Sequence, residues 1–317
     1  MKVLITNSCN KILMETLASN GFDCHFHPDI KENELILKVD NFEGIITSQK
    51  IVFSKYVVDR SLNVKFIGWI GSGLENIDTE YAESKGITCL NAPEGLSNAV
   101  GEHALAMLLN LFNNLCRANM QVKNGIWKRD LNRGIEIAGK TVCIIGYGNT
   151  GQAFAKKLSG FEAKVLAFDK YKSRYDDGFC QESTMDEIFQ QCDILSLHIP
   201  LTKETYNLVD FQYLKKFKKN IYLINTSRGS VVKTDDISNA MQSGKILGAA
   251  LDVLEFEKTS FENLHFGNMP ESLQYLIDND NVILSPHIAG STVESEYKTA
   301  EILAEKIIKS FKDQIIT

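Results

Sequence analysis

The sequence Gly146-Tyr147-Gly148-Asn149-Thr150-Gly151 has the residue types and spacing of a phosphate-binding turn. The first glycine permits a tight turn, the second lets the backbone approach a pyrophosphate, and the third lets a helix pack closely on a strand. A helix that starts here adds unpaired N–H donors and a dipole that favours an anion. The pattern predicts a dinucleotide site, although a purely structural glycine turn would have the same letters.

Asp169 stands at the end of the next apolar run, Lys164–Phe168. A carboxylate at this place can bond both ribose hydroxyls of an adenosine and would repel a 2′-phosphate. We therefore predict NAD rather than NADP as the cofactor. Lys170, Lys172 and Arg174 follow closely, so use of NADP stays open.

Three further residues, Arg228, Glu257 and His287, each follow a run that is predicted to be a strand. In open α/β sheets, ligands bind beyond the carboxyl ends of the strands. An arginine can hold a carboxylate through two parallel hydrogen bonds, and a histidine can exchange a hydroxyl proton near neutral pH. Taken singly, they could be a surface ion-pair residue, a solvated glutamate and a turn histidine. Together they suit hydride transfer between an alcohol and NAD.

The elements that must position these residues alternate along the chain. Apolar runs predict strands, listed by residue: 3–6, 44–47, 66–69, 141–145, 164–168, 194–197, 222–225, 248–252 and 282–284. Helical patterns lie between them, at 10–20, 55–59, 152–158 and 292–312, and a long apolar helix is expected over 97–125. Alternation of this kind predicts parallel sheets with crossover helices. The long helix should be buried on more than one side, between domains or between subunits.

The composition narrows the class of protein. A chain of 317 residues usually forms two domains, and 44% apolar with 23% charged residues is ordinary for a globular protein. The net charge of −6 argues against nucleic-acid and membrane-surface partners. No apolar run is long enough to cross a bilayer. The seven cysteines are odd in number and contain no C-x-x-C pair, so we expect reduced thiols in the cytoplasm and no metal site.

At this point the sequence resembles the D-isomer-specific 2-hydroxyacid dehydrogenase family, and within it the D-3-phosphoglycerate dehydrogenases. The resemblance covers nearly the whole chain. Beside the glycine turn it is carried by four segments: Gly71-Ser72-Gly73-Leu74-Glu75-Asn76-Ile77-Asp78, Asn91-Ala92-Pro93, Val100-Gly101-Glu102-His103, and His198-Ile199-Pro200-Leu201-Thr202 with Thr205.

The resemblance implies a role for each matching residue. His287 would be the acid/base, Glu257 its partner and Arg228 the substrate clamp, while the amides of Ser72 and Gly73 would bind the substrate carboxylate. Further residues would lie on the cofactor side, with the last two near the nicotinamide: His198, Pro200, Thr205, Thr226 and Asp252. Asp78 and Glu102 would be structural carboxylates that cap or brace, and the rings of His103 and of the cofactor-side His198 would pack or bond the backbone.

The fold implied is α/β, with two doubly wound, Rossmann-like parallel-sheet domains and a cleft between them. Residues 1–96 and 289–317 would form a discontinuous substrate-binding domain, and residues 97–288 the NAD-binding Rossmann domain. The resemblance also implies a homodimer, or a dimer of dimers, built through the long-helix region.

The resemblance implies a small 2-hydroxy or 2-oxo acid as the substrate, and three alternatives for the function stay open. The resemblance favours oxidation of 3-phosphoglycerate to phosphohydroxypyruvate, a step of serine biosynthesis. Arginines common in such enzymes are replaced here by Thr47 and Trp69, which favours a glyoxylate, hydroxypyruvate or D-lactate-type reductase unless Lys50, Arg129 or Arg133 compensates. An insertion at 261–276 could also reshape the site. A third possibility is an NAD-sensing interaction protein without turnover.

Overall fold

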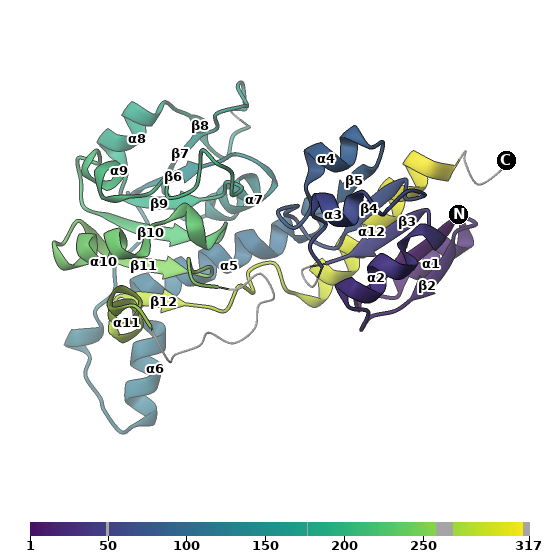
Figure 1. Cartoon of the computed structure of the whole chain (residues 1–317). Coiled ribbons are helices and arrows are strands. Elements are labelled where there is room, and N and C mark those ends of the chain that lie inside the picture. Colours follow the sequence, from purple (N-terminus) through teal and green to yellow (C-terminus); the bar gives the residue numbers. More distant parts are fainter. Residues whose placement is uncertain (49–50, 176, 258–268, 313–317) are drawn as a thin grey trace. The chain divides into compact units, whose positions relative to one another are not determined.

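The computed structural model describes residues 1–48, 51–175, 177–257 and 269–312 (Figure 1). The chain divides into two compact units, Met1–Ser97 with Ser291–Thr317 (unit 1) and Asn98–Gly290 (unit 2). The boundaries expected from the sequence were 96/97 and 288/289, one and two residues away. Each unit is built around its own parallel sheet.

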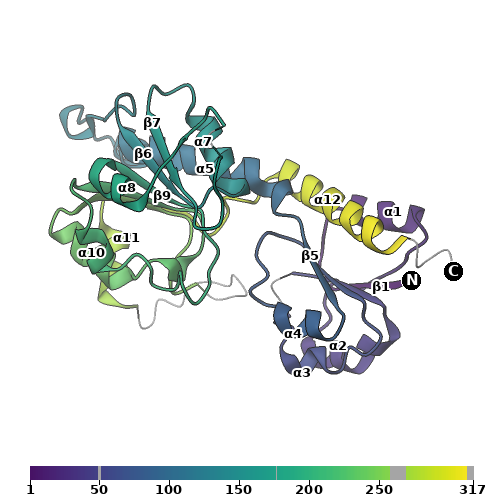
Figure 2. The same ribbon diagram turned by 90° about the horizontal axis from the view of Figure 1, so that it is seen from above.

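Unit 1 has a five-stranded sheet in the order β2-β1-β3-β4-β5, with every neighbouring pair parallel. Its strands are β1 (Lys2–Ile5), β2 (Asp23–Phe26), β3 (Gly44–Thr47), β4 (Phe66–Trp69) and β5 (Thr88–Asn91). Helices α1 (Ile12–Ser19) and α12 (Val293–Phe311) cover one face, and α2 (Glu32–Lys38), α3 (Lys55–Val58) and α4 (Thr79–Ser84) cover the other (Figure 2). The last helix of the chain thus completes the sheet that the first residues begin.

Alternating residues of the three inner strands of unit 1, β1, β3 and β4, enter two separate cores. Leu4, Ile45 and Ile67 pack in the core on the side of α2, α3 and α4. Their neighbours Ile46 and Phe66 pack in the core that α1 and α12 cover. Because both faces are buried, these strands are continuous apolar runs rather than alternating ones, which is why the sequence pattern identified them.

Unit 2 has a seven-stranded parallel sheet in the order β12-β11-β10-β9-β6-β7-β8. The strands are β6 (Thr141–Ile145), β7 (Lys164–Phe168), β8 (Gln181–Glu182), β9 (Ile194–Leu197), β10 (Ile221–Asn225), β11 (Ile246–Leu251) and β12 (Val282–Leu284). The chain runs outward from β6 in one direction and then returns to β9 on its other side. This reversal between β6 and β9 creates the switch point at which dinucleotides bind in open α/β sheets.

Helices also cover both faces of the second sheet. Residues of α5 (Pro93–Asn113) and α7 (Asn149–Leu158) pack on one face. The other face is covered by α8 (Met185–Gln191), α9 (Phe211–Lys215), α10 (Thr234–Gln242) and α11 (Glu271–Asp278). Two doubly wound parallel sheets therefore confirm the predicted α/β class. No helix of the described residues is long and apolar enough to cross a membrane.

The long helix expected over 97–125 is wrong in its extent. The structure has two helices, α5 and α6 (Leu115–Lys123), separated by Asn114 in the left-handed conformation with φ 54°. The first begins earlier than expected, at Pro93, because proline is well suited to the first turn of a helix. Helix α6 has no buried residue within the single chain, so for this part of the segment only burial between subunits is consistent with the expectation.

Candidate functional site

The glycine turn between β6 and α7 leaves one open side. A Cβ on Gly146, whose φ is +90°, would collide with the carbonyl oxygen of His198, and one on Gly151 would collide with that of Gly146. Near Gly148, by contrast, no described atom lies within 4 Å of the place a Cβ would take. The first and third glycines are therefore required by the turn itself, and the second borders the space in which a pyrophosphate fits. Asn149 and Thr150 begin helix α7 beside this space.

The carboxylate of Asp169 lies next to this turn. It accepts hydrogen bonds from the backbone N–H of Tyr147 at 2.8 Å, of Tyr171 at 2.9 Å and of Lys172 at 3.0 Å. A carboxylate offers about four acceptor positions, so one remains for a ribose hydroxyl. Of the nearby cations, Lys170 pairs with Glu204, and the Lys172 ammonium donates to the carbonyl of Tyr147. Neither lysine neutralises Asp169 directly, which favours NAD over NADP.

The side chain of Tyr147 turns into the protein. It is fully buried, stacks on Tyr175 with 4.9 Å between the ring centroids, and its hydroxyl donates to Asp177 at 3.0 Å. The prediction that Tyr147 binds the cofactor is therefore restricted to its backbone. The order of letters in the turn could not show which way this ring points.

Strands β10, β11 and β12 are adjacent, and they end at the same level of the sheet. Asn225 pairs with Leu251, and Leu251 pairs with Leu284. The loops that follow these three strands therefore start side by side, and they carry Arg228, Glu257 and His287 respectively. All three residues lie in unit 2.

Glu257 and His287 form a direct pair. The Nδ1 atom of His287 lies 2.9 Å from the carboxylate of Glu257, and the two side chains are 24% and 23% exposed. Because an ionised carboxylate only accepts hydrogen bonds, Nδ1 carries the proton in this pair. The pairing fixes the tautomer of the imidazole and directs Nε2 to the opposite side of the ring.

The loop after β10 is held by its own polar groups. Asn225 donates from its amide to the carbonyl of Arg228 at 3.0 Å, and the Arg228 guanidinium donates to the carbonyl of Ser227 at 2.8 Å. A Cβ on the next residue, Gly229, would collide with the carbonyl of Leu254. Glycine is thus required where this loop meets the loop after β11. Arg228 itself remains half-buried, so its guanidinium can reach a ligand.

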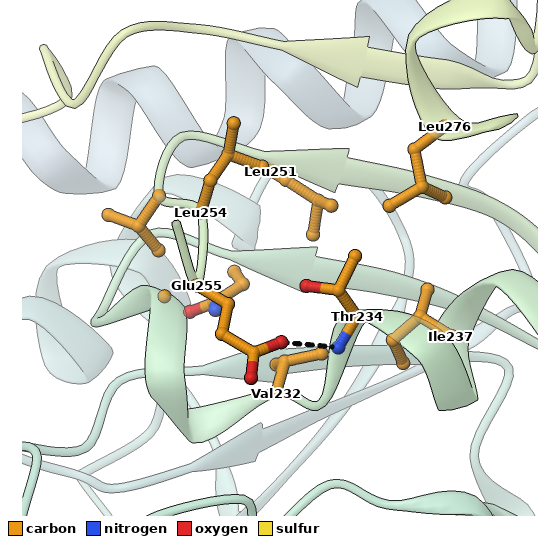
Figure 3. Close-up of a pocket in the computed structure, with 10 residues that line it drawn as sticks. Val232, Thr234, Ile237, Leu251, Leu254, Glu255 and Leu276 are labelled. Atoms are coloured by element: carbon orange, nitrogen blue, oxygen red, sulfur yellow. Dashed lines mark hydrogen bonds between the residues drawn. The ribbon is translucent and has the colours of Figure 1, made fainter. Parts of the chain in front are cut away.

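Glu255, the other glutamate of the loop after β11, contacts a different element. Glu255 accepts a hydrogen bond from the N–H of Thr234 at 2.8 Å, at the start of α10 (Figure 3). Both residues line a pocket with apolar walls from Val232, Leu254 and Leu276. The pocket has a volume of about 10 Å³ for the centre of a water molecule, which is room for about one water molecule. It is a packing void, and Glu257 rather than Glu255 is the glutamate that contacts His287.

His287 has an unusual backbone conformation. Its φ is +55°, in the left-handed region that favours glycine or asparagine. Its N–H donates to the carbonyl of Asp252 at 2.7 Å and to that of Ser285 at 3.1 Å. These bonds link the loop after β12 to the end of β11.

Asp252 lies at the centre of a buried polar cluster. Its carboxylate accepts from the Ser285 hydroxyl at 2.6 Å and from the N–H groups of Ile288 at 2.9 Å and Ala289 at 2.8 Å. The Nε2 atom of His103 lies 3.5 Å from the same carboxylate. Burial alone would raise the pKa of Asp252, but the hydrogen bonds from His103, Ser285 and the two amides outweigh it and lower that pKa. Sequence patterns did not reveal the part played by His103 and Ser285.

Thr226 and His198 each present a buried polar atom that has no hydrogen-bond partner among the described residues: Oγ1 of Thr226 and Nδ1 of His198. Such atoms are uncommon in folded proteins, and at the end of β10 the Thr226 hydroxyl suits a cofactor group. The His198 ring instead packs against Phe154, 5.5 Å between centroids, and its Nε2 lies 2.9 Å from the Ser196 hydroxyl. Burial lowers the pKa of His198 to about 3, so the ring is neutral at physiological pH.

The other cofactor-side segment predicted, around Pro200 and Thr205, forms an ordered loop after β9. The Thr205 hydroxyl donates to the carbonyl of Pro200 at 2.7 Å and accepts from the N–H of Thr202 at 2.7 Å. Pro200 is exposed and Thr205 is half-buried. The loop starts on the β9 side of the switch point.

In unit 1, Ser72 and Gly73 lie half-buried in the loop after β4. The side-chain amide of Asn91 donates to the carbonyl of Ser72, which fixes the loop to the end of β5. Asp78 accepts a hydrogen bond from the N–H of Tyr81 at 3.2 Å and so caps helix α4.

The two positions where arginine was expected supply no cation. Thr47 is fully buried, and its hydroxyl accepts from Thr6 at 2.9 Å; Trp69 is only 4% exposed. Lys50 lies outside the described residues. Arg133 and Asp130 form an exposed ion pair at 3.5 Å, in a segment of unit 2 that with Arg129 borders an open hollow.

Known proteins resemble this chain over nearly its whole length. Residues 105–289 match the family model described as D-isomer specific 2-hydroxyacid dehydrogenase, NAD binding domain. Glyoxylate reductase of Thermofilum pendens is 36% identical over 290 residues, which cover 89% of this chain and 82% of that protein. The chain belongs to the D-isomer specific 2-hydroxyacid dehydrogenase family.

Other members of the family differ in length and name. D-3-phosphoglycerate dehydrogenase of Archaeoglobus fulgidus is 32% identical and matches 98% of this chain, but the chain spans only 58% of that protein. The crystal structure of D-lactate dehydrogenase from Aquifex aeolicus, complexed with NAD and lactic acid, has a TM-score of 0.82 and 28% identity over 100% of this chain and 96% of that one.

NAD is therefore the cofactor of this family member. The residues present fit it, because the space beside Gly148 is open, Asp169 keeps an acceptor position, and the buried hydroxyl of Thr226 has no partner among the described residues.

Proposed function

We propose that this protein is an NAD-dependent dehydrogenase that acts on D-2-hydroxy acids. The observation that carries the proposal is the His287–Glu257 pair, 2.9 Å apart, at the same sheet edge as Arg228 and in the NAD-binding unit. A histidine oriented by a carboxylate is the arrangement that general acid–base catalysis requires.

In the oxidising direction, Nε2 of His287 accepts the proton of the substrate hydroxyl. Glu257 holds the ring by its Nδ1–H and stabilises the positive charge that develops on it. The Arg228 guanidinium binds the substrate carboxylate and the oxygen that becomes a carbonyl. NAD, when bound, supplies the hydride acceptor, and the turn around Gly148 together with Asp169 would hold it. In the reducing direction, the protonated His287 returns the proton.

The test is a His287→Gln variant, assayed by NADH absorbance and by NADH binding. General acid–base catalysis typically contributes about 10²- to 10⁴-fold, so we expect a loss of turnover of that size. Binding of NADH, followed by fluorescence, should stay close to wild type. Full turnover in the variant would contradict the proposal. Binding of NADH by the wild-type protein without turnover of any 2-oxo acid would instead favour the NAD-sensing interaction protein.

For the substrate, we propose 3-phosphoglycerate first, with a role in serine biosynthesis. It is supported by the similarity of nearly the whole chain to enzymes with that name. An unphosphorylated acid such as glyoxylate or hydroxypyruvate is the second candidate. It is favoured by the buried Thr47 and Trp69, which offer no cation for a phosphate.

A panel of four 2-oxo acids separates these candidates. NADH oxidation would be followed with phosphohydroxypyruvate, hydroxypyruvate, glyoxylate and pyruvate. Preference for phosphohydroxypyruvate would support the first candidate and indicate other cations, such as Lys50. Preference for an unphosphorylated acid would exclude it.

We also infer a homodimer, or a dimer of dimers, in the cytoplasm. The support is a group of exposed apolar side chains in and after α6, including Leu115 at 56%, Met120 at 58%, Trp127 at 77% and Leu131 at 62%. Exposed apolar surface of this kind commonly marks a protein interface. Light scattering of a Trp127→Glu variant should show a smaller particle than wild type. The seven free thiols favour a reducing compartment.

A further inference from the structure

The left-handed backbone of His287 needs support from its surroundings. Residues other than glycine remain in this region only when neighbouring contacts hold them there. Here the contacts come from two residues, since the N–H of His287 donates to the backbone carbonyls of both Asp252 and Ser285. The carboxylate of Asp252 also accepts from the N–H groups of Ile288 and Ala289, which follow His287 in the same loop. The orientation of the His287 ring toward Glu257 therefore depends on where the Asp252 side chain lies.

Asp252 is in turn held by the side chains of His103 and Ser285, which have no role in the mechanism proposed above. The Ser285 hydroxyl must donate to Asp252, because they are 2.6 Å apart and a carboxylate cannot donate. Ser285 has only one hydroxyl hydrogen, so at 3.0 Å from Nε2 of His103 its oxygen is the acceptor. His103 consequently carries a proton on Nε2. The hydrogen bonds therefore all point the same way: His103 donates to Ser285, and Ser285 donates to Asp252.

The start of this series lies on helix α5, close to its buried face. His103 belongs to α5, and Met107, one turn later on the same helix, also contacts the Ser285 hydroxyl through its sulfur at 3.7 Å. Met107 is only 4% exposed. The series therefore connects the core of unit 2 to the loop that carries His287.

We propose that His103 and Ser285 are positioning residues for the reaction: they fix Asp252, which clamps the loop after β12 and holds His287 against Glu257. The proposal rests on the acid–base role of His287 given above. Neither His103 nor Ser285 transfers a proton to the substrate in this scheme. Loss of either lets the imidazole leave its reactive orientation, while the glycine turn and Asp169 stay as they are.

The test compares four variants in the wild-type background. Ser285→Ala and His103→Leu remove a donor, while Ser285→Thr and His103→Gln keep one at a similar place. Ser238→Ala is a matched control, since Ser238 is a buried serine of α10 in the same unit whose hydroxyl accepts from Gln242. Each variant would be assayed with NADH and the 2-oxo acid of the panel that wild type reduces fastest.

A small misplacement of a catalytic group can cost up to about a hundredfold in rate, so we expect kcat to fall roughly ten- to a hundredfold in Ser285→Ala and His103→Leu. The KM for the 2-oxo acid and the affinity for NADH should change much less. The solvent deuterium isotope effect on kcat should rise, because proton transfer becomes slower, and Ser285→Thr and His103→Gln should recover most of kcat. A merely structural role would lower the melting temperature without moving the isotope effect of the folded enzyme.

Two results would overturn the proposal. One is a wild-type kcat and isotope effect in His103→Leu and Ser285→Ala. The other is an equal loss in the Ser238→Ala control. A His287→Gln variant measured in parallel separates this failure from failure of the proposed function. If His287→Gln is inactive while the two donor-removing variants are unaffected, the dehydrogenase proposal stands and the positioning proposal falls.

Discussion

Replacement of Glu257 by glutamine should slow the reaction without weakening NADH binding. The native carboxylate accepts the Nδ1 proton of His287 at 2.9 Å, and only this arrangement directs Nε2 to take up the substrate proton. A glutamine of the same shape loses the charge. Its amide can also turn its NH₂ group toward Nδ1, which would move the imidazole proton to Nε2 and block the ring as a base.

The size of the effect follows from the exposure of the pair. Hydrogen bonds to charged groups contribute about 1.5–3 kcal/mol, and both side chains here are roughly one-quarter exposed, which favours the lower part of that range. A loss of about 1.5–2 kcal/mol corresponds to about a ten- to thirtyfold lower kcat.

The assay is steady-state NADH absorbance, with NADH affinity measured separately by fluorescence. Glu255→Gln is the matched control, since Glu255 lies two residues earlier and bonds the N–H of Thr234 instead of His287. It should retain wild-type kcat. The reasoning would be refuted by a Glu257→Gln variant whose kcat is within twofold of wild type, or by a control that loses as much.

Three further outcomes are expected. Burial holds the pKa of His198 at about 3 against 6.5 in an unfolded chain, so below pH 6.5 only the unfolded state gains the proton. The free energy of unfolding should then fall by about 1.4 kcal/mol per pH unit as the pH drops from about 6.5 to about 5. In the His198→Gln variant, the unfolding free energy measured by urea titration should depend less steeply on pH. Asp169→Ser should raise kcat/KM with NADPH relative to NADH at least about tenfold, because a like charge beside the 2′-phosphate is removed; an unchanged ratio would contradict the assigned contact. Gly229→Ala should be destabilised by about 1–3 kcal/mol in thermal melts, since its Cβ would collide with Leu254, whereas Gly160→Ala, with no described atom within 4 Å of the new Cβ, should be close to neutral.

Much of the fold could be predicted because the central strands are buried on both faces. The bounds expected for β3, β4, β6, β7 and β9 agree with the structure, and so do those of β12, a half-buried edge strand that is still an apolar run. β2, β5 and β8 were missed, since they are edge strands with exposed or half-buried residues and no continuous apolar run. The break at Asn114 was also missed, because asparagine is tolerated within helical patterns and only its left-handed φ ends α5.

The site could be predicted in part for a similar reason. Parallel strands place their carboxyl ends on one edge, so Arg228, Glu257 and His287 could be assigned to that edge without coordinates. The contact of His103 with Ser285 spans 182 positions of the sequence. No local pattern connects such residues, and the segment that contains His103 implied only packing or a backbone hydrogen bond for its ring. Long-range polar contacts of this kind become visible only when the helix and the loop are placed together.

Helix α12 has a consequence for how the protein folds during synthesis. Its side chains Leu303, Ile307 and Phe311 belong to the same core as Val3 and Phe66, near the other end of the chain. A ribosome releases unit 2 complete before this helix has emerged, so the sheet of unit 1 waits with one face partly uncovered. Contacts of such long sequence separation form slowly, and the exposed strands are open to aggregation in the interval. Unit 2 should therefore reach its native state first, and unit 1 should be the part that depends on chaperones.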